Sequence, residues 1–270
     1  MKISVIVPVF NNLEYTKDCV TDLLNCKNLN LEIIVIDNGS TDKTMQFLKK
    51  FSELIVISNS TNLGCAYSWN QGLSKSTGDW IIVLNNDVRI PKNCFYQLIE
   101  SSIIRKLDIA SPGMREGQLD YNLEIFFDEF TSRMKTAFRK WTPSGVCFAL
   151  RRSVVDKVGF FDENYKIGQY EDADFFRRCK NAKLKMGITG ASFIHHFGSS
   201  TQKYLKEKGA TGYALKNRNY HRKKWKLGFF QRNFERYREQ LLTKIWSYKE
   251  RFQYGHSLLE RSEGQKISYL

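Results

Sequence analysis

The stretch Gly78-Asp79-Trp80-Ile81-Ile82-Val83-Leu84-Asn85-Asn86-Asp87-Val88 decides the fold class. Its apolar centre, Trp80 to Leu84, is rich in β-branched residues and too short for a helix, which predicts a strand buried on both faces of a parallel sheet. The strand ends in Asn85-Asn86-Asp87, and open α/β sheets bind ligands at the carboxyl ends of their strands. A carboxylate flanked by amides can hold a hard divalent cation, with phosphate oxygens and water as the other ligands. A polar turn without any function has the same composition, so the choice between a cation site and a turn depends on the rest of the chain.

Strands alternate with helices through the first third of the chain. The predicted strands are 3–10, 31–36, 54–58 and 80–84, and the predicted helices are 13–26, 43–51 and 65–76. This alternation is typical of a parallel, doubly wound α/β sheet. Asp37 and Asp87 each follow a strand, so both carboxylates are expected to face one crevice. In such a crevice a carboxylate can accept a hydrogen bond from the imide N–H of a pyrimidine.

The middle of the chain is less regular. Its predicted elements are helices at 93–106 and 170–182 and strands at 108–111, 143–150 and 184–194. Residues 113–140 mix aromatic and charged side chains without a clear period, so no element is predicted there. The residues after Thr201 are basic and aromatic and are predicted to be helical.

The composition is that of an ordinary globular protein. Hydrophobic residues make up 42% of the 270, and no apolar run approaches the roughly 18 to 20 residues that span a bilayer. The N-terminal run Met1 to Pro8 lacks a small-residue cleavage site, so we interpret it as a core strand rather than a signal peptide. The six cysteines are scattered without metal-like pairs, which favours reduced thiols and a cytoplasmic location.

The positive charge is concentrated towards the C-terminus. The net charge is +14, and residues 201–270 carry 17 Lys and Arg against 6 Asp and Glu, a net +11. We therefore expect this tail to meet something anionic, which could be phosphate groups, a membrane surface or nucleic acid.

Further candidates for chemistry lie near residues 171 and 195. Glu171, Asp172 and Asp174 crowd the start of a predicted helix, where acidic side chains commonly cap free N–H groups. A carboxylate projecting into a site would instead be a general base, although the residues alone favour the cap. His195 and His196 should point to opposite faces of a strand, so at most one reaches a given site. Either one is more often structural, but imidazole can also ligate manganese.

The order of several motifs carries a family resemblance. Three of them, Val5-Ile6-Val7-Pro8-Val9-Phe10, Ile36-Asp37-Asn38-Gly39-Ser40-Thr41-Asp42 and Asn62-Leu63-Gly64, resemble the N-terminal half of family-2 inverting glycosyltransferases with the GT-A fold. Leu84-Asn85-Asn86-Asp87 resembles their Asp-x-Asp metal motif. The acceptor half is similar in Gly159-Phe160-Phe161-Asp162-Glu163, Glu171-Asp172-Ala173-Asp174 and His196-Phe197-Gly198-Ser199. The similarity spans about residues 3 to 201.

The resemblance implies a role for each matching residue. Asp87 would hold Mg²⁺ or Mn²⁺ on the donor diphosphate, and His196 would be a further metal or diphosphate contact. Asp172 would be the catalytic base, with Glu171 as the second candidate. The donor would be bound by Pro8, Phe10, Asp37, Asn62, Gly64, Asn85 and Asn86, with Asp37 reading uracil or thymine. The first Asp of Asp-x-Asp is Asn85 here, a form that resembles rhamnosyl-type and surface-polysaccharide enzymes and implies weaker metal affinity or an altered donor preference.

The resemblance also implies an architecture and a reaction. Residues 1–200 would form the GT-A catalytic domain, a Rossmann-like, mostly parallel sheet flanked by helices. Residues 1–90 would be its nucleotide-sugar half and 91–200 its acceptor half. A basic helical extension would follow at 201–270. The enzyme would move a sugar from a UDP- or dTDP-linked donor to a hydroxyl of a glycan or lipid-linked glycan, with inversion.

Two other functions remain open from the residues. A nucleic-acid-binding protein could use basic charge interleaved with aromatics, but nothing here resembles a known nucleic-acid module. A sugar nucleotidyltransferase usually has a glycine-rich, basic loop after its first strand, and Asn11-Asn12-Leu13-Glu14 is not one. Trp225, Phe229, Phe230 and Trp246 in the tail either pack on the catalytic domain or meet an anionic membrane at its inner face.

Overall fold

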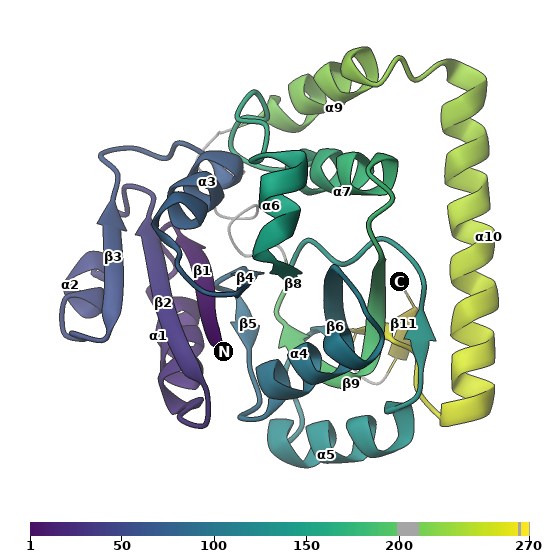
Figure 1. The fold of residues 1–270 in the computed structure, drawn as a ribbon, viewed down its shortest axis with the longest axis horizontal. Helices are drawn as coiled ribbons and strands as arrows, with labels where there is room; N and C mark the ends of the chain where they lie inside the picture. The colour runs from purple at the N-terminus through teal and green to yellow at the C-terminus, as the bar shows by residue number, and fades with distance from the viewer. Residues whose placement is uncertain (199–210, 264–265, 270) are drawn as a thin grey trace.

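The computed structural model describes residues 1–198, 211–263 and 266–269, in which helices flank a central sheet (Figure 1). The strands are β1 Lys2–Val9, β2 Asn30–Asp37, β3 Leu54–Ser58, β4 Trp80–Leu84, β5 Val88–Arg89, β6 Ile109–Gly117, β7 Phe138–Arg139, β8 Cys147–Arg151, β9 Met186–His196, β10 Leu259–Glu263 and β11 Lys266–Tyr269. The helices are α1 Leu13–Asn25, α2 Thr44–Leu48, α3 Cys65–Lys75, α4 Cys94–Ile104, α5 Leu123–Met134, α6 Arg152–Val158, α7 Glu171–Asn181, α9 Tyr213–Lys224 and α10 Phe229–Tyr254.

The predicted parallel sheet is present in the N-terminal part. The strand order is β11-β10-β6-β8-β4-β1-β2-β3, and β4, β1, β2 and β3 pair in parallel. β8 runs antiparallel between β4 and β6, and parallel pairing resumes where β6 meets β9 and β10. The carboxyl ends of β1, β2 and β4 therefore lie at one edge, as the sequence predicts.

Two apolar cores cover the two faces of the sheet. One joins the sheet to α1, α4 and α5, and the other joins it to α3, α6 and α7. Alternation along β1 assigns its side chains to the two cores, with Val5 and Val7 in the first and Ile6 in the second. β4 is buried along its whole length, which explains its unbroken apolar run.

The strand predicted at 108–111 continues to Gly117 as β6. Pro112 and Gly113 look like strand breakers in sequence. In the structure they fall at a register shift between β6 and β9, so the strand bends and continues. The extension places Glu116 opposite His196. It also resolves part of the unassigned stretch 113–140, which contains α5 and β7 as well.

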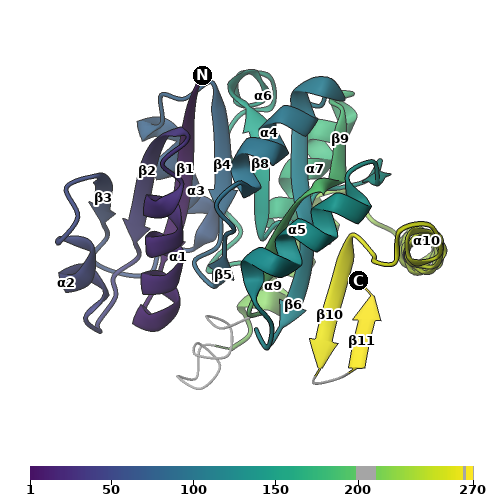
Figure 2. The ribbon, with the colours of Figure 1, turned by 90° about the horizontal axis from the view of Figure 1, so that it is seen from below.

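The C-terminal part is helical in α9 and α10, as predicted, but it also contains two strands. β10 pairs in parallel with β6 and antiparallel with β11, so the C-terminal part extends the central sheet. The predicted domain boundary at 200/201 and Ser199 lie outside the described residues. α10 stands at the edge of the molecule opposite β3 (Figures 1 and 2). Among the helices that the structure describes, none is both long and apolar enough to cross a membrane.

Candidate active site

A cleft of about 1130 Å³ opens at the carboxyl ends of β1 and β4. It is bounded by the start of α7, the end of β9, and α9 and α10. Most of the predicted site residues line it, namely Pro8, Phe10, Asn62, Asn85, Asn86, Asp87, Glu171, Asp172 and His196. The predicted donor, metal and base residues are therefore gathered around one space.

Asp37 and Gly64 are not among the lining residues of this cleft. Asp37 is only 2% exposed, and its Oδ1 accepts a hydrogen bond from the Ser40 N–H at 3.2 Å. It thereby shapes the turn after β2, and reading of a pyrimidine by Asp37 stays a prediction. The next residue, Asn38, does line the cleft and donates from Nδ2 to Asn62 Oδ1 at 3.3 Å.

Gly64 holds two loops in close contact. Its φ of +92° is a conformation that favours glycine. A Cβ at this position would lie 2.7 Å from the backbone nitrogen of Ile167. The following N–H, that of Cys65, donates to the Ile167 carbonyl at 2.8 Å. Gly64 thus ties the start of α3 to the loop that precedes α7.

Asp87 and His196 meet at the cleft wall. The antiparallel pairing of β5 with β9 sets Val88 opposite His196, and His196 Nε2 lies 3.3 Å from Asp87 Oδ1. On its other side, His196 Nδ1 lies 3.2 Å from Glu116 Oε2. Burial by itself would lower the pKa of His196, but its hydrogen bonds with Asp87 and Glu116 outweigh burial and raise the pKa to about 9.

His195 has a structural role. Its Nδ1 lies 2.8 Å from the Tyr121 hydroxyl, its Nε2 lies 3.1 Å from the Gly117 carbonyl, and burial lowers its pKa to about 4. One histidine of the pair reaches the cleft, as strand alternation predicts.

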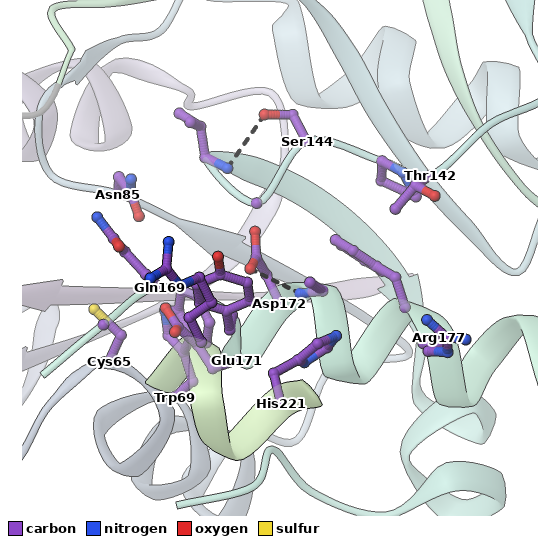
Figure 3. Close-up of a pocket in the computed structure, with 18 of the residues that line it drawn as sticks. Cys65, Trp69, Asn85, Thr142, Ser144, Gln169, Glu171, Asp172, Arg177 and His221 are labelled. Atoms are coloured by element: carbon purple, nitrogen blue, oxygen red, sulfur yellow. Dashed lines mark hydrogen bonds between the residues drawn. The ribbon is translucent and has the colours of Figure 1, made fainter. Parts of the chain in front are cut away.

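The two asparagines before Asp87 differ in their surroundings. Asn86 is buried and donates from Nδ2 to Thr16 Oγ1 of α1 at 3.0 Å, which anchors the end of β4 to that helix. Asn85 is fixed through its backbone, whose N–H donates to the Val146 carbonyl at 2.9 Å. Its side chain borders the cleft in Figure 3.

The three carboxylates at the start of α7 separate into three environments. Asp174 is fully buried and accepts hydrogen bonds from Arg178 Nε at 3.0 Å and Trp225 Nε1 at 2.9 Å, so it is structural. Glu171 is 5% exposed, and its Oε2 has no hydrogen-bond partner among the described residues. Burial, followed by the charge of Asp172, raises the pKa of Glu171 to about 8. Asp172 lines the cleft as Glu171 does, and it is the only one of the three carboxylates with intermediate exposure.

Asp172 is held in place by its own helix and by a glycine. Its Oδ1 accepts a hydrogen bond from the Ala173 N–H at 2.7 Å, and burial raises its pKa. Figure 3 shows the carboxylate pointing into the cleft, toward the segment that carries Ser144. A Cβ on the adjacent Gly145 would lie 2.1 Å from Asp172 Oδ2, so the carboxylate occupies space that only glycine leaves open.

A clamped loop leads into α7. Ile167, Gln169 and Tyr170 have φ values of +66°, +74° and +76°, which are unfavourable for residues with side chains. Asn217 of α9 is 2% exposed and holds this loop. Its Nδ2 lies within hydrogen-bonding distance of three carbonyls, those of residues 166, 168 and 169, at 2.8 to 3.1 Å. Its Oδ1 accepts from the Lys166 N–H at 3.1 Å.

The α9 and α10 side of the cleft is basic. The arginines that line it from these helices are Arg218, Arg222, Arg232, Arg236 and Arg238, and the lining acids there are Glu235 and Glu239. Glu235 is paired with Arg177 of α7 at 3.7 Å. This wall therefore carries an excess of positive charge.

Glu116, Gly145 and Asn217 are site residues that the sequence did not reveal. A carboxylate near a strand end is the signal that pointed to Asp87, but Pro112 and Gly113 hid the end of β6. Gly145 follows Pro143-Ser144 and resembles any turn glycine. Asn217 lies in a polar helical run, where a buried amide cannot be told from its exposed neighbours.

The fold is that of the GT-A glycosyltransferases. The family model described as glycosyl transferase family 2 matches residues 4–159, more than half of the chain, and the chain belongs to this family. The predicted family and fold are confirmed. The protein is therefore a glycosyltransferase, and not a sugar nucleotidyltransferase or a nucleic-acid-binding protein.

Solved structures and a relative agree with this assignment. TarS 1–349 from S. aureus has a TM-score of 0.57 at 20% identity, over 74% of this chain and 61% of that one. The mannosyltransferase PcManGT from Pyrobaculum calidifontis, solved with GDP-Man and Mn²⁺, has a TM-score of 0.57 at 16% identity, over 72% and 56%. These likenesses show the fold alone. Glycosyltransferase GlyA from Streptococcus pneumoniae is 31% identical over 112 residues, which are 40% of this chain and 16% of GlyA.

Proposed function

We propose that the protein is an inverting glycosyltransferase that uses a UDP- or dTDP-linked sugar and a hydroxyl of a glycan or lipid-linked glycan. The observation that carries the proposal is the gathering of Asp87, His196 and Asp172 around one cleft at the carboxyl ends of β1 and β4. PcManGT, which shares the fold, was solved with a nucleoside-diphosphate sugar and Mn²⁺, which supports a donor of this class.

Asp87 and His196 fit a divalent cation, Mg²⁺ or Mn²⁺. Among the described residues, no group of three or more His, Cys, Asp or Glu side chains could hold a metal. A carboxylate and an imidazole at 3.3 Å suit an ion that takes its remaining ligands from phosphate and water, and His196 Nε2 would release its proton when the ion binds. Glu116 behind His196 would orient the imidazole. When bound, the ion supplies a Lewis acid that offsets charge on the leaving diphosphate.

Asp172 is proposed as the general base. Its carboxylate takes the proton of the acceptor hydroxyl while that oxygen bonds to the anomeric carbon and the bond from this carbon to the diphosphate oxygen breaks. A single displacement inverts the configuration at that carbon. Glu171, whose pKa is raised to about 8, stays largely protonated at neutral pH and adds little negative charge beside the base.

We further propose that the enzyme works in the cytoplasm at the inner face of a membrane, in the synthesis of a surface polysaccharide. The arginine-rich wall of the cleft suits an acceptor that carries phosphate, as a lipid-linked glycan does. The net charge of +11 in residues 201–270 favours an anionic surface.

The test is a screen of UDP-, dTDP- and GDP-sugars with Mg²⁺ or Mn²⁺, read as donor hydrolysis and as thermal stabilisation of the protein. Asp172→Asn should keep donor stabilisation and lose turnover by roughly 10² to 10⁴. Asp87→Ala should lose both turnover and metal-dependent stabilisation by the nucleoside diphosphate.

Two results would overturn parts of this proposal. Full activity in EDTA, together with an Asp87→Ala variant equal to wild type, would remove the metal. Unchanged turnover in Asp172→Asn, with loss of turnover in Glu171→Gln, would move the base to Glu171.

A further inference from the structure

α10 carries an apolar stripe that faces away from the rest of the protein. We define the outer stripe as the seven residues Phe230, Phe234, Tyr237, Leu241, Ile245, Tyr248 and Phe252. Their side chains are 39% to 87% exposed. Placed at 3.6 residues per turn, they fall within roughly 80° of the helix circumference. Five of the seven are aromatic, which makes a large apolar surface on an exposed helix.

The opposite face of α10 is fixed to the catalytic domain. Glu250 is 8% exposed and pairs with Arg139 at 2.9 Å, and the Trp246 ring lies 4.9 Å from that of Trp141. Trp246 therefore packs on the rest of the protein, as one of the two expectations for the tail aromatics had it. Trp225 is also held there, because its Nε1 donates a hydrogen bond to Asp174. Because these contacts fix the rotation of the helix, the outer stripe points outward.

The charges of α10 are distributed by face. Lys244 and Arg251 flank the outer stripe on one side, and Arg238 and Lys249 flank it on the other. Within Phe229–Tyr254, all of which the structure describes, the acids are Glu235, Glu239 and Glu250. At 3.6 residues per turn they lie about 120° to 180° from the centre of the stripe, on the side of the protein. The stripe is thus bordered by positive charge.

We propose that the outer stripe docks in the interfacial layer of an anionic lipid membrane. A helix with aromatic and aliphatic residues on one face and basic residues along its borders suits this layer. Each lysine or arginine near an anionic surface favours binding, and aromatic rings suit the headgroup depth. The inference specifies the surface behind the membrane location proposed above, and its test needs neither donor nor acceptor.

A second copy of the chain fits the stripe less well. Pairing two stripes would place the basic borders of both helices side by side, which is repulsive. The steps between successive stripe residues are 4, 3, 4, 4, 3 and 4. They average about 3.7 residues, whereas a left-handed coiled coil needs 3.5. The stripe is therefore nearly straight, as a helix lying on a flat surface requires.

The experiment is co-sedimentation of the full chain with vesicles of phosphatidylcholine, with and without phosphatidylglycerol, at low and high salt. Wild type should bind only the vesicles with phosphatidylglycerol, and more weakly in high salt. Phe230→Ser, Phe234→Ser and Phe252→Ser together should weaken the partition coefficient at least about tenfold. Lys244→Gln with Lys249→Gln should weaken it by roughly 30-fold.

Matched variants guard against general effects. Ile104, Ile125 and Phe160 are exposed elsewhere, and their triple replacement by serine should leave binding unchanged. Lys49→Gln with Lys50→Gln is the charge control, since both are exposed beside α2. Melting temperatures confirm that each variant is folded. Equal binding to both vesicle types, no binding, or loss of binding in the controls would overturn the proposal. So would a wild-type dimer in light scattering that the stripe variants dissociate.

Discussion

Gly145 is the residue on which the position of Asp172 depends. Gly145→Ala would bring a Cβ to 2.1 Å from Asp172 Oδ2, so the carboxylate has to move. A displacement of about 1 Å at a reacting group can cost about 10²-fold in rate. We expect turnover to fall by about that factor while donor affinity, measured by calorimetry, stays the same.

Gly228→Ala is the matched control for Gly145→Ala. A Cβ at Gly228 would have no heavy atom within 4 Å, so this variant should keep wild-type turnover. Equal turnover of Gly145→Ala and wild type would show that the position of Asp172 in the cleft does not matter for the reaction.

Glu171 makes stability depend on pH. Its pKa is about 8 in the folded chain, above the ordinary value of 4.5 for a glutamate. Between these two values the folded state binds more protons than the unfolded state, so stability falls as pH rises through this window. Glu171→Gln cannot ionise and should raise the melting temperature, relative to wild type, progressively from about pH 5 to about pH 8.

Thermal unfolding at several pH values measures this effect. The gain for a chain of this size should be roughly 2 to 4 °C per kcal/mol. Glu53→Gln, which changes an exposed carboxylate, is the control and should show no such trend. A constant difference between Glu171→Gln and wild type over the whole range would contradict the raised pKa.

At the scale of elements, α9 fixes the loop that leads into α7. Asn217→Ala removes the hydrogen bonds from Nδ2 to the half-buried carbonyls of residues 166, 168 and 169. Because three residues of this loop have positive φ, we expect it to relax and to displace the start of α7. Turnover should fall at least tenfold, while donor affinity changes less than twofold.

Hydrogen exchange distinguishes this local effect from general loss of stability. Amides of residues 166–172 should exchange faster in Asn217→Ala, while those of β1 and β4 stay protected. Asn219→Ala, an exposed neighbour on the same helix, should leave both exchange and turnover unchanged. Faster exchange throughout the sheet would instead mean that Asn217 supports the fold as a whole.

Prediction from sequence succeeded where one local pattern dominates. Trp80–Leu84 and Leu54–Ser58 match the predicted strands residue for residue, because apolar runs between polar turns leave little choice. It failed at Pro112-Gly113, where pairing with β9 continues a strand that local propensity would end. It also missed β10. Leu259–Glu263 has one apolar residue followed by four polar ones, which gives no strand pattern, and the segment forms a strand by pairing with β6.

The same limit applies to the candidate site. Asp87 could be predicted because it stands at the end of a strand whose direction follows from the chain order. Asp172 is singled out only by the family resemblance, since the residues alone favour a helix cap. The pairing of His196 with Glu116 depends on the register of β6 against β9. The two residues are 80 positions apart in the chain, so no local sequence pattern predicts that register. The clamp by Asn217 depends on where α9 docks, and no local pattern carries that information.

At the scale of the whole molecule, a buried ion pair holds α10 to the catalytic domain. Glu250 faces Arg139 and also accepts hydrogen bonds from Ser257 Oγ and the Leu258 N–H, both at 2.9 Å. Removing one partner of a buried pair typically costs about 3 to 5 kcal/mol. We expect Glu250→Ala to lower the melting temperature by roughly 10 °C in differential scanning calorimetry.

The exposed pair Glu14–Lys17 provides the comparison. Glu14→Ala should change stability by no more than about 0.5 kcal/mol, because water screens the pair. If Glu250→Ala melts at the same temperature as Glu14→Ala, then α10 is held by its aromatic contacts rather than by Glu250.

The two faces of α10 have a consequence for the length of the acceptor. The helix contributes Arg232 and Arg236 to the wall of the cleft, while the outer stripe lies on its far side. Only the thickness of one helix, about 10 Å, separates these faces. On a membrane-docked enzyme the thickness of the helix would hold the cleft at a constant height above the lipid. A lipid-linked acceptor would have to present its hydroxyl at that height, so the enzyme would select acceptors by their length.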